Sequence, residues 1–180
     1  MKQVKNWFAR PTIRSMALCG VMIALEVVLQ RFCGISNAVI QLHFGFLPIA
    51  VIAFFYGPLY AGFGWAMADI LGMLVFPTGG GGGWYFGFTV SAFLMGILFG
   101  IFLCRVKEKP LFRILCAVLS VSLLITFCLD MFWLHLYWGN GFLALLPTRL
   151  IKVAVMIPLQ TLCLLGLHRL ILRAHLYEKF

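Results

Sequence analysis

The stretch from Gly57 to Phe76 contains 20 residues and a single charged side chain, Asp69. A segment of about 20 mainly apolar residues can cross the hydrocarbon core of a membrane as a helix. Five glycines, Gly79–Gly83, and then three aromatic residues follow it closely. An acid inside a membrane-crossing helix costs about 2.5–3.5 kcal/mol or more unless it is paired. The stretch therefore predicts a membrane protein in which Asp69 has a structural or functional role inside the membrane.

The rest of the chain has the same character. Of its 180 residues, 63% are apolar and 11% are charged, whereas a soluble domain carries about 25% charged residues. We expect an all-α, polytopic membrane protein in which residues 1–180 form a single membrane domain. The formal charge of +9 does not indicate nucleic-acid binding, because the basic residues lie at the ends of apolar runs. The six cysteines show no metal-ligand spacing, and no cofactor is expected.

Hydropathy and charge together predict six transmembrane helices in one bundle. Their expected ranges are about 13–31, 44–57, 59–76, 87–104, 112–134 and 146–169. The second is short and contains Pro48, so we expect it to be kinked or to extend into its neighbours. With six spans, eleven of the fourteen Lys and Arg residues fall on one side, which the positive-inside rule makes the cytoplasm. Both termini are then cytoplasmic, and the protein is a multi-pass protein of the cell membrane.

The first expected helix has two different faces. Ala17, Gly20 and Ala24 form a smooth face of small residues, which favours close helix contact. Glu26 and Gln30 share another face, because Glu26 lies about 200° around the helix from Ala24. Arg31 follows at the outer interface.

The remaining polar residues within the spans leave alternatives open. Asp69 either pairs with a basic residue of the sixth helix or accepts hydrogen bonds from a ligand with two adjacent N–H groups. Arg149 and Lys152 share one face of the sixth helix with Gln160, and two cations one turn apart repel each other. Glu26 or Asp130 neutralises them, or an anionic ligand does. Thr126 precedes Asp130 by one turn, and a polar pair, either within this helix or with another helix, is the expected role of Asp130.

These groups are expected from the membrane midplane outward, with almost none in the cytoplasmic half. Such a distribution favours capture of a ligand from outside, whereas a channel needs polar residues through the whole thickness. Trp84, Tyr85 and Phe88 after the glycine run can close over a flat ligand. Asn140, in the outer connection, either joins the rim of this site or belongs with its aromatic neighbours to an interface belt. No catalytic constellation is present, so an enzyme is not expected.

Several motifs resemble a known family. The segments Leu47–Gly62 (LPIAVIAFFYGPLYAG), Ala68–Gly72 (ADILG), Phe76–Gly80 (FPTGG), Phe86–Thr89 (FGFT) and Leu146–Lys152 (LPTRLIK) are similar to substrate-capture subunits of energy-coupling factor (ECF) transporters. Within that family the similarity is to the folate-specific type, and it extends over about residues 10–170. The glycine run is longer than the family pattern.

The resemblance implies a six-helix subunit that binds folate or a related pterin with high affinity from outside. It also implies docking on a transmembrane coupling subunit, EcfT, driven by two cytoplasmic ATPase subunits, with Ala17, Gly20 and Ala24 at the contact. Folate suits the residues: its pterin N–H groups match a carboxylate, its rings match the aromatics, and its glutamate carboxylates match Arg149 and Lys152. Capture of thiamin or riboflavin is the alternative within the class; a membrane enzyme or an assembly factor is the alternative outside it.

Overall fold

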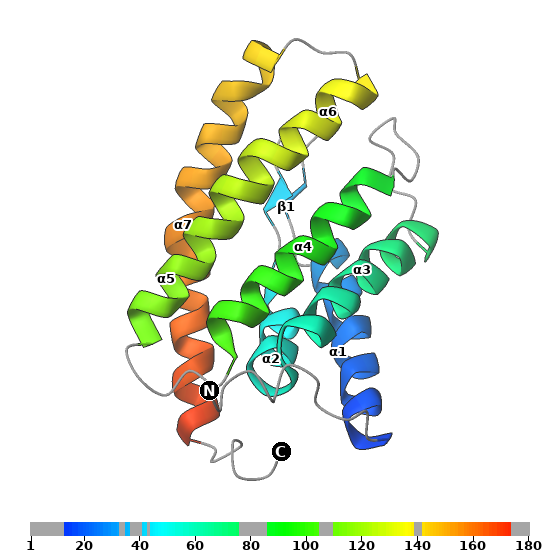
Figure 1. Cartoon of the computed structure of the whole chain (residues 1–180), viewed down its shortest axis with the longest axis vertical. Helices are drawn as coiled ribbons and strands as arrows, with labels where there is room; N and C mark the ends of the chain where they lie inside the picture. The colour runs from blue at the N-terminus through cyan, green and yellow to red at the C-terminus, as the bar shows by residue number, and fades with distance from the viewer. Residues whose placement is uncertain are drawn as a thin grey trace.

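The computed structural model describes residues 13–32, 35–36, 41–42, 44–75, 86–104, 110–138 and 142–173. The helices are α1 (Ile13–Phe32), α2 (Phe46–Tyr56), α3 (Pro58–Val75), α4 (Phe86–Leu103), α5 (Pro110–Ser120), the π-helical segment η2 (Val121–Leu129), α6 (Asp130–Trp138) and α7 (Phe142–Arg173). Since α5, η2 and α6 follow one another without a break, they form one long helix (Figure 1). The described residues thus form six helical rods, each close to a predicted range, and the all-α fold class is confirmed.

A short hairpin that the sequence reading did not predict joins α1 to α2. Strand β1 (Ile35–Ser36) pairs in antiparallel fashion with β2 (Gln41–Leu42), and β2 lies against α7. With two residues in each strand, the hairpin adds a connection and leaves the helical architecture unchanged.

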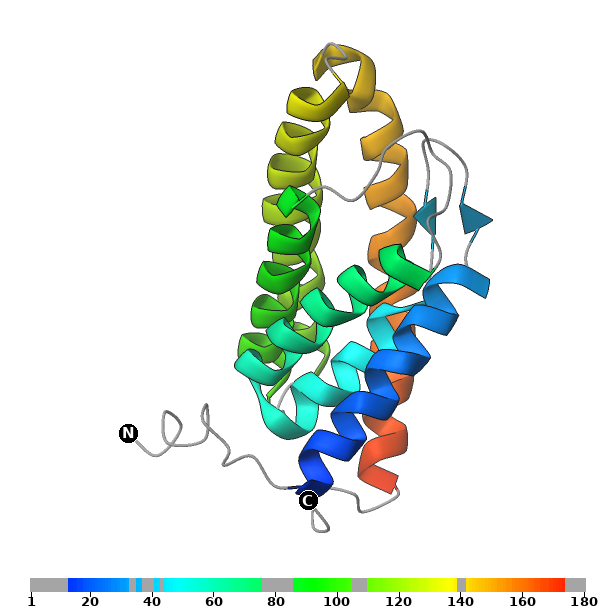
Figure 2. The ribbon, with the colours of Figure 1, turned by 90° about the vertical axis from the view of Figure 1, so that its right-hand side faces the viewer.

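The helices run alternately up and down. In Figures 1 and 2 the start of α1, the end of α4, the start of α5 and the end of α7 lie at one end, whereas the end of α6 and the start of α7 lie at the other. Among the described basic residues, Arg14 begins α1, Arg113 begins α5, and Arg169 and Arg173 end α7. The grouping of these residues at one end of the bundle is therefore as predicted.

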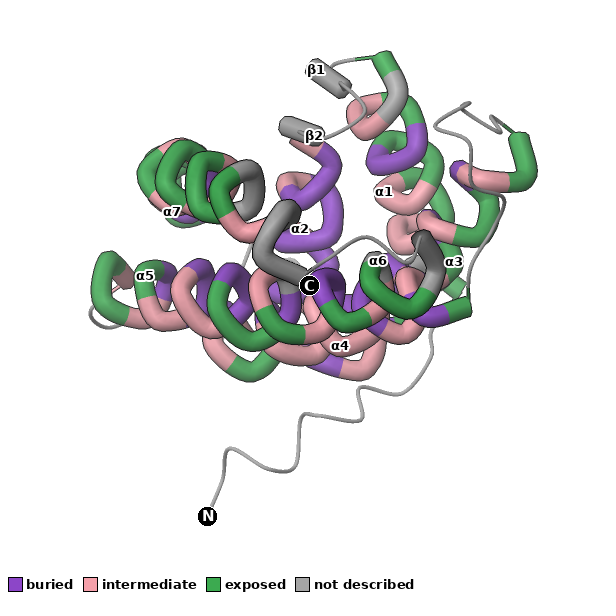
Figure 3. The backbone as a smooth tube through the Cα atoms, turned by 90° about the horizontal axis from the view of Figure 1, so that it is seen from above, coloured by how far each residue is buried: buried purple, intermediate pink, exposed green. Residues whose placement is uncertain are grey.

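Helix α2 is the centre of the bundle and not a full span. Its 11 residues extend about 16 Å, against about 30 Å for the hydrocarbon core. Pro48 lies in the first turn, where the missing N–H is tolerated, and α2 ends at Tyr56 without extending into α3. Gly57, with φ of 88°, makes a tight turn to Pro58. Buried residues dominate α2 in Figure 3.

By length and composition, four described helical segments can cross a membrane: Pro58–Val75, Phe86–Leu103, Pro110–Trp133 and Leu150–Arg173. The apolar parts of α1 and α2 are shorter, at Ser15–Gln30 and Phe46–Tyr56. Because α2 is enclosed by its neighbours, it does not need the length of a lipid-facing span.

Helices α3 and α4 make the most extensive contact in the bundle. A β-carbon at Gly96 would overlap the backbone of Ala61 and Gly62, and one at Gly100 would overlap the backbone of Pro58. Gly96 and Gly100 therefore let the two helix backbones touch, as small residues do where membrane helices pack closely. Trp65 of α3 stacks on Phe99 of α4, with ring centroids 5.5 Å apart. The α3–α4 pair is a rigid platform for the residues at its upper end.

Candidate functional site

The upper end of the α3–α4 pair holds Asp69. The Thr89 hydroxyl donates a hydrogen bond to Asp69 Oδ2 over 2.8 Å, and this bond links α3 to α4. Asp69 is half-buried and Thr89 is 7% exposed. A carboxylate has four lone-pair sites, so one hydroxyl leaves Asp69 with capacity for a second donor. A basic residue of the last helix was one predicted partner of Asp69, whereas Thr89 was not among the predicted partners.

Helix α7 has a stripe of buried residues on its inner face that continues into polar residues near its start. Met156, Gln160, Leu164 and His168 recur every four residues and are all buried, so they mark the inward stripe. Lys152 continues this stripe towards the α6–α7 junction and is half-buried. Arg149 lies one turn further on the same stripe; its backbone is part of α7 and its side chain is outside the described set. The predicted shared face of these residues is present.

Helix α1 has the two faces that the sequence predicted. Glu26 is fully buried and Gln30 is half-buried, on the side that packs against α2 and α3. Ala17, Gly20 and Ala24 are exposed on the opposite side. A β-carbon at Gly20 would meet no described atom within 4 Å. The small residues of α1 therefore do not serve packing inside this bundle.

The structure brings only part of the predicted site into view. Phe88 is half-buried beside Thr89 on α4, and Arg31 is placed by its backbone at the end of α1. Trp84, Tyr85 and Asn140 lie outside the described residues, as does the glycine run. Closure of the aromatic turn over a ligand stays a prediction.

Two buried polar side chains, Ser91 and Gln160, were not predicted as site residues from the sequence. Ser91 on α4 is 1% exposed and Gln160 on α7 is 8% exposed; neither Ser91 Oγ nor Gln160 Oε1 has a hydrogen-bond partner among the described residues. The recurrence of residues every four positions on the inner face of α7 is the sequence signal from which Gln160 could have been predicted as a buried site residue. A polar atom buried without a partner is costly, so these two oxygens are suited to meet a ligand or an ordered water.

The half of the bundle that holds the start of α1 and the end of α7 is more polar than predicted. His168 is 1% exposed near the end of α7, with its ring centroid 5.7 Å from that of Phe54, and Ser15 is buried near the start of α1. The sequence reading expected almost no polar groups there. Among the described residues, no group of three His, Cys, Asp or Glu side chains could hold a metal ion.

Comparison with known proteins places these features in context. A family model described as "ECF transporter, substrate-specific component" matches residues 14–168. A folate transporter FolT of Clostridium novyi is 34% identical over 168 residues, covering 93% of this chain and 95% of the relative. A FolT of Leuconostoc mesenteroides is 27% identical, covering 87% and 85%.

Two solved structures share the arrangement of the helices. A crystal structure of FolT bound with folic acid superposes with a TM-score of 0.79 at 37% identity, covering 87% of this chain and 94% of the other. The biotin S-component of an ECF-type ABC transporter superposes with a TM-score of 0.69 at 19% identity, covering 90% and 94%. The second likeness concerns the fold alone.

Proposed function

Because this chain belongs to the family of ECF transporter substrate-specific components, we propose that it captures folate or a related pterin at the outer face of the cell membrane. The family membership inferred from the sequence motifs is confirmed, and the chain is a transport subunit and not an enzyme. The observation that carries the choice of folate is the similarity, at 37% identity and over 87% of the chain, to a FolT whose crystal structure contains folic acid.

The residue chemistry supports the same ligand. Asp69, held at the top of the α3–α4 platform by Thr89, accepts hydrogen bonds from the pterin amino and ring N–H groups. Arg149 and Lys152, on the inward stripe of α7, bind the carboxylates of the glutamate tail. The other residues that we propose contact the ligand are Glu26, Gln30, Arg31, Trp84, Tyr85, Phe88 and Asn140.

Titration of the purified subunit tests this assignment. Folate should bind tightly, pteroate more weakly because it lacks the two carboxylates of the glutamate tail, and thiamin and riboflavin should not compete. A thiamin pocket needs no pair of cations for carboxylates, so tight thiamin binding with weak folate binding would replace our proposal by its alternative.

The variant Asp69→Asn should lose preference for the pterin. An amide has one acceptor oxygen and one NH2 donor, so it cannot form the two-pronged contact in which each of two adjacent ligand N–H groups meets its own oxygen; a loss of roughly 1.5–3 kcal/mol in folate binding is expected. Thr89→Val is the matched control, because it removes the hydroxyl donor and leaves the carboxylate in place. If both variants melt early in detergent and bind folate normally once folded, Asp69 is a structural link between α3 and α4.

Delivery of the ligand requires partners. The exposed small-residue face of α1, formed by Ala17, Gly20 and Ala24, docks on the transmembrane coupling subunit. Two cytoplasmic ATPase subunits drive that module, and both termini of the chain lie on their side of the membrane. The grouping of Arg14, Arg113, Arg169 and Arg173 at one end of the bundle supports this orientation.

A further inference from the structure

The long helix from Pro110 to Trp138 contains nine consecutive π-helical residues, Val121–Leu129. Asp130 is the first residue after them, and its backbone N–H donates to the carbonyl oxygen of Ile125, five residues earlier. A π-helical segment takes up more residues per turn than an α-helix and is rare, most often as a single turn at a functional site. A run of nine residues immediately before a buried acid is therefore a specific feature of this helix.

The π-helical segment changes which side of the long helix faces inward. The buried residues of its first half follow the α-helical spacing: Ile114, Ala117, Val118, Val121, Ser122 and Ile125. An uninterrupted α-helix, at about 100° per residue, would then put Asp130 roughly 150° from the centre of this stripe, nearly on the outer side. Instead Asp130 is 9% exposed and Met131 is fully buried.

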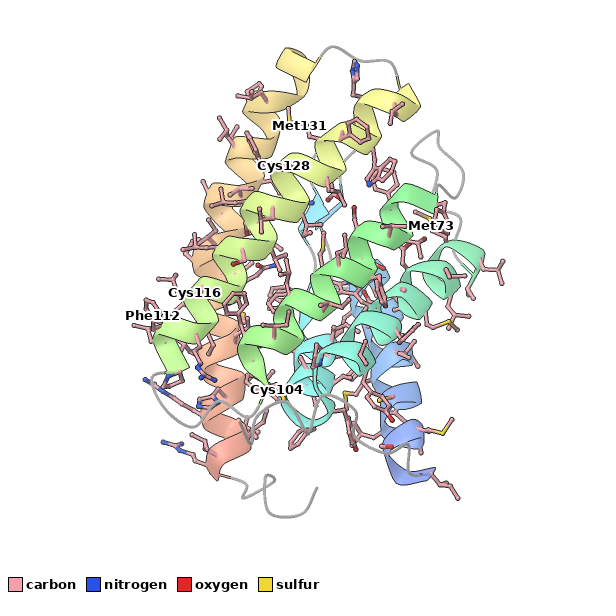
Figure 4. The ribbon with its side chains drawn as sticks, in the orientation of Figure 1. Met73, Cys104, Phe112, Cys116, Cys128 and Met131 are labelled. Carbon is pink, nitrogen blue, oxygen red and sulfur yellow. The ribbon has the colours of Figure 1, made fainter. Side chains whose placement is uncertain are left out.

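The outer face shows the same shift. Cys128 and Met131, both labelled in Figure 4, are three residues apart and would share a face in an α-helix. Cys128 is exposed, whereas Met131 is buried. Phe132, which would join the inner stripe in an uninterrupted helix, is 54% exposed. The additional residues of the π-helical turns therefore rotate α6 relative to α5.

The rotation turns Asp130 inward at the same height in the bundle as the cations of α7. Helices α6 and α7 are antiparallel (Figures 1 and 2), and both α6 and η2 contact α7. Asp130 lies eight residues before the end of α6, and Leu150 lies eight residues after the start of α7. Both are about 12 Å from the junction, so Asp130 is level with the turn that carries Arg149 and Lys152.

We propose that the π-helical segment Val121–Leu129 sets the register of the long helix so that Asp130 faces the cations of α7 and orients them for the carboxylates of the ligand. Asp130 is then a positioning residue, which holds two mutually repelling cations on the inner side of the bundle. The role of Asp130 rests on the proposed function, whereas the role of the π-helical segment in setting the register does not.

Single-residue deletions test the register. Leu124 in the π-helical segment and Leu115 in α5 are both exposed leucines. Deleting Leu124 lets an α-helix bring Asp130 to within about 50° of the inner stripe, so this variant should fold, melt no earlier than the wild type and keep folate binding. Deleting Leu115 turns the buried stripe away from its neighbours and should lower the melting temperature sharply. If deleting Leu124 lowers the melting temperature as much as deleting Leu115, removing one residue from the π-helical segment does not restore the α-helical register. The proposal is then wrong.

Substitutions test the role of Asp130. Asp130→Asn should weaken folate binding about tenfold, the size of one net hydrogen bond, and change pteroate binding much less, because pteroate lacks the glutamate tail. Asp130→Glu should restore most of the folate affinity. Equal losses for the two ligands, or no loss, would refute the positioning role. Wild-type protein that binds no folate would instead refute the proposed function, and the melting of the two deletion variants would still decide the register.

Discussion

Replacing Arg149 and Lys152 together by alanine should weaken folate binding by about two to four orders of magnitude and leave the fold intact. Each charge-assisted contact contributes roughly 1.5–3 kcal/mol, and the glutamate tail offers two carboxylates to the two cations. Lys152 lies on the inward stripe of α7 that Met156 and Gln160 continue. Titration calorimetry on the purified double variant measures the loss.

A matched pair at the other end of the same helix serves as the control. Arg169 and Arg173 are exposed basic residues of α7, and replacing both by alanine removes the same charge from the protein. This variant should bind folate as the wild type does. An unchanged affinity in the Arg149 and Lys152 variant, or an equal loss in both variants, would reject the anion site.

Introducing leucine at Gly20 and Ala24 should abolish ATP-driven folate uptake by the complete transporter and spare folate binding by the isolated subunit. Both residues are exposed, and a β-carbon at Gly20 would meet no described atom within 4 Å. Bulky side chains there do not disturb the bundle, but they prevent close approach of a partner helix. Uptake into vesicles and ligand titration measure the two effects separately.

Gly166 provides the control for this surface. It is an exposed glycine of α7 whose β-carbon position is equally open, so Gly166→Leu should change neither binding nor uptake. Normal uptake with leucine at positions 20 and 24 would refute docking through this face of α1. Loss of binding by the isolated subunit would show instead that the two small residues pack within the bundle.

The sequence predicted the helices well because apolar length and charge at the ends determine them. The six ranges needed only local patterns of hydropathy and charge, whereas the α3–α4 contact at Gly96 and Gly100 is seen only in the packed bundle. The central position of α2 was not predictable in the same way. An 11-residue helix is short for a span, and only its enclosure by other helices explains why that is tolerated.

The candidate site was less predictable because hydrogen-bond partners come from distant segments. Thr89 lies 20 residues from Asp69, and only the packing of α3 on α4 joins them. The sequence left the partner of Asp130 open between its own helix and another one, since a standard helical period says nothing about the face onto which a π-helical segment turns it. His168 was overlooked because one histidine in an apolar run carries no periodic signal.

Identification of the molecule that copurifies with the subunit tests the proposed function most directly. The protein should be isolated from cells grown with a mixture of vitamins, heat-denatured, and the released small molecules identified by mass spectrometry. We expect folate or a reduced folate, at close to one molecule per chain, and a reduced yield from the Asp69→Asn variant. Release of thiamin or riboflavin in place of any pterin would contradict the assignment of this chain as a folate-capture subunit.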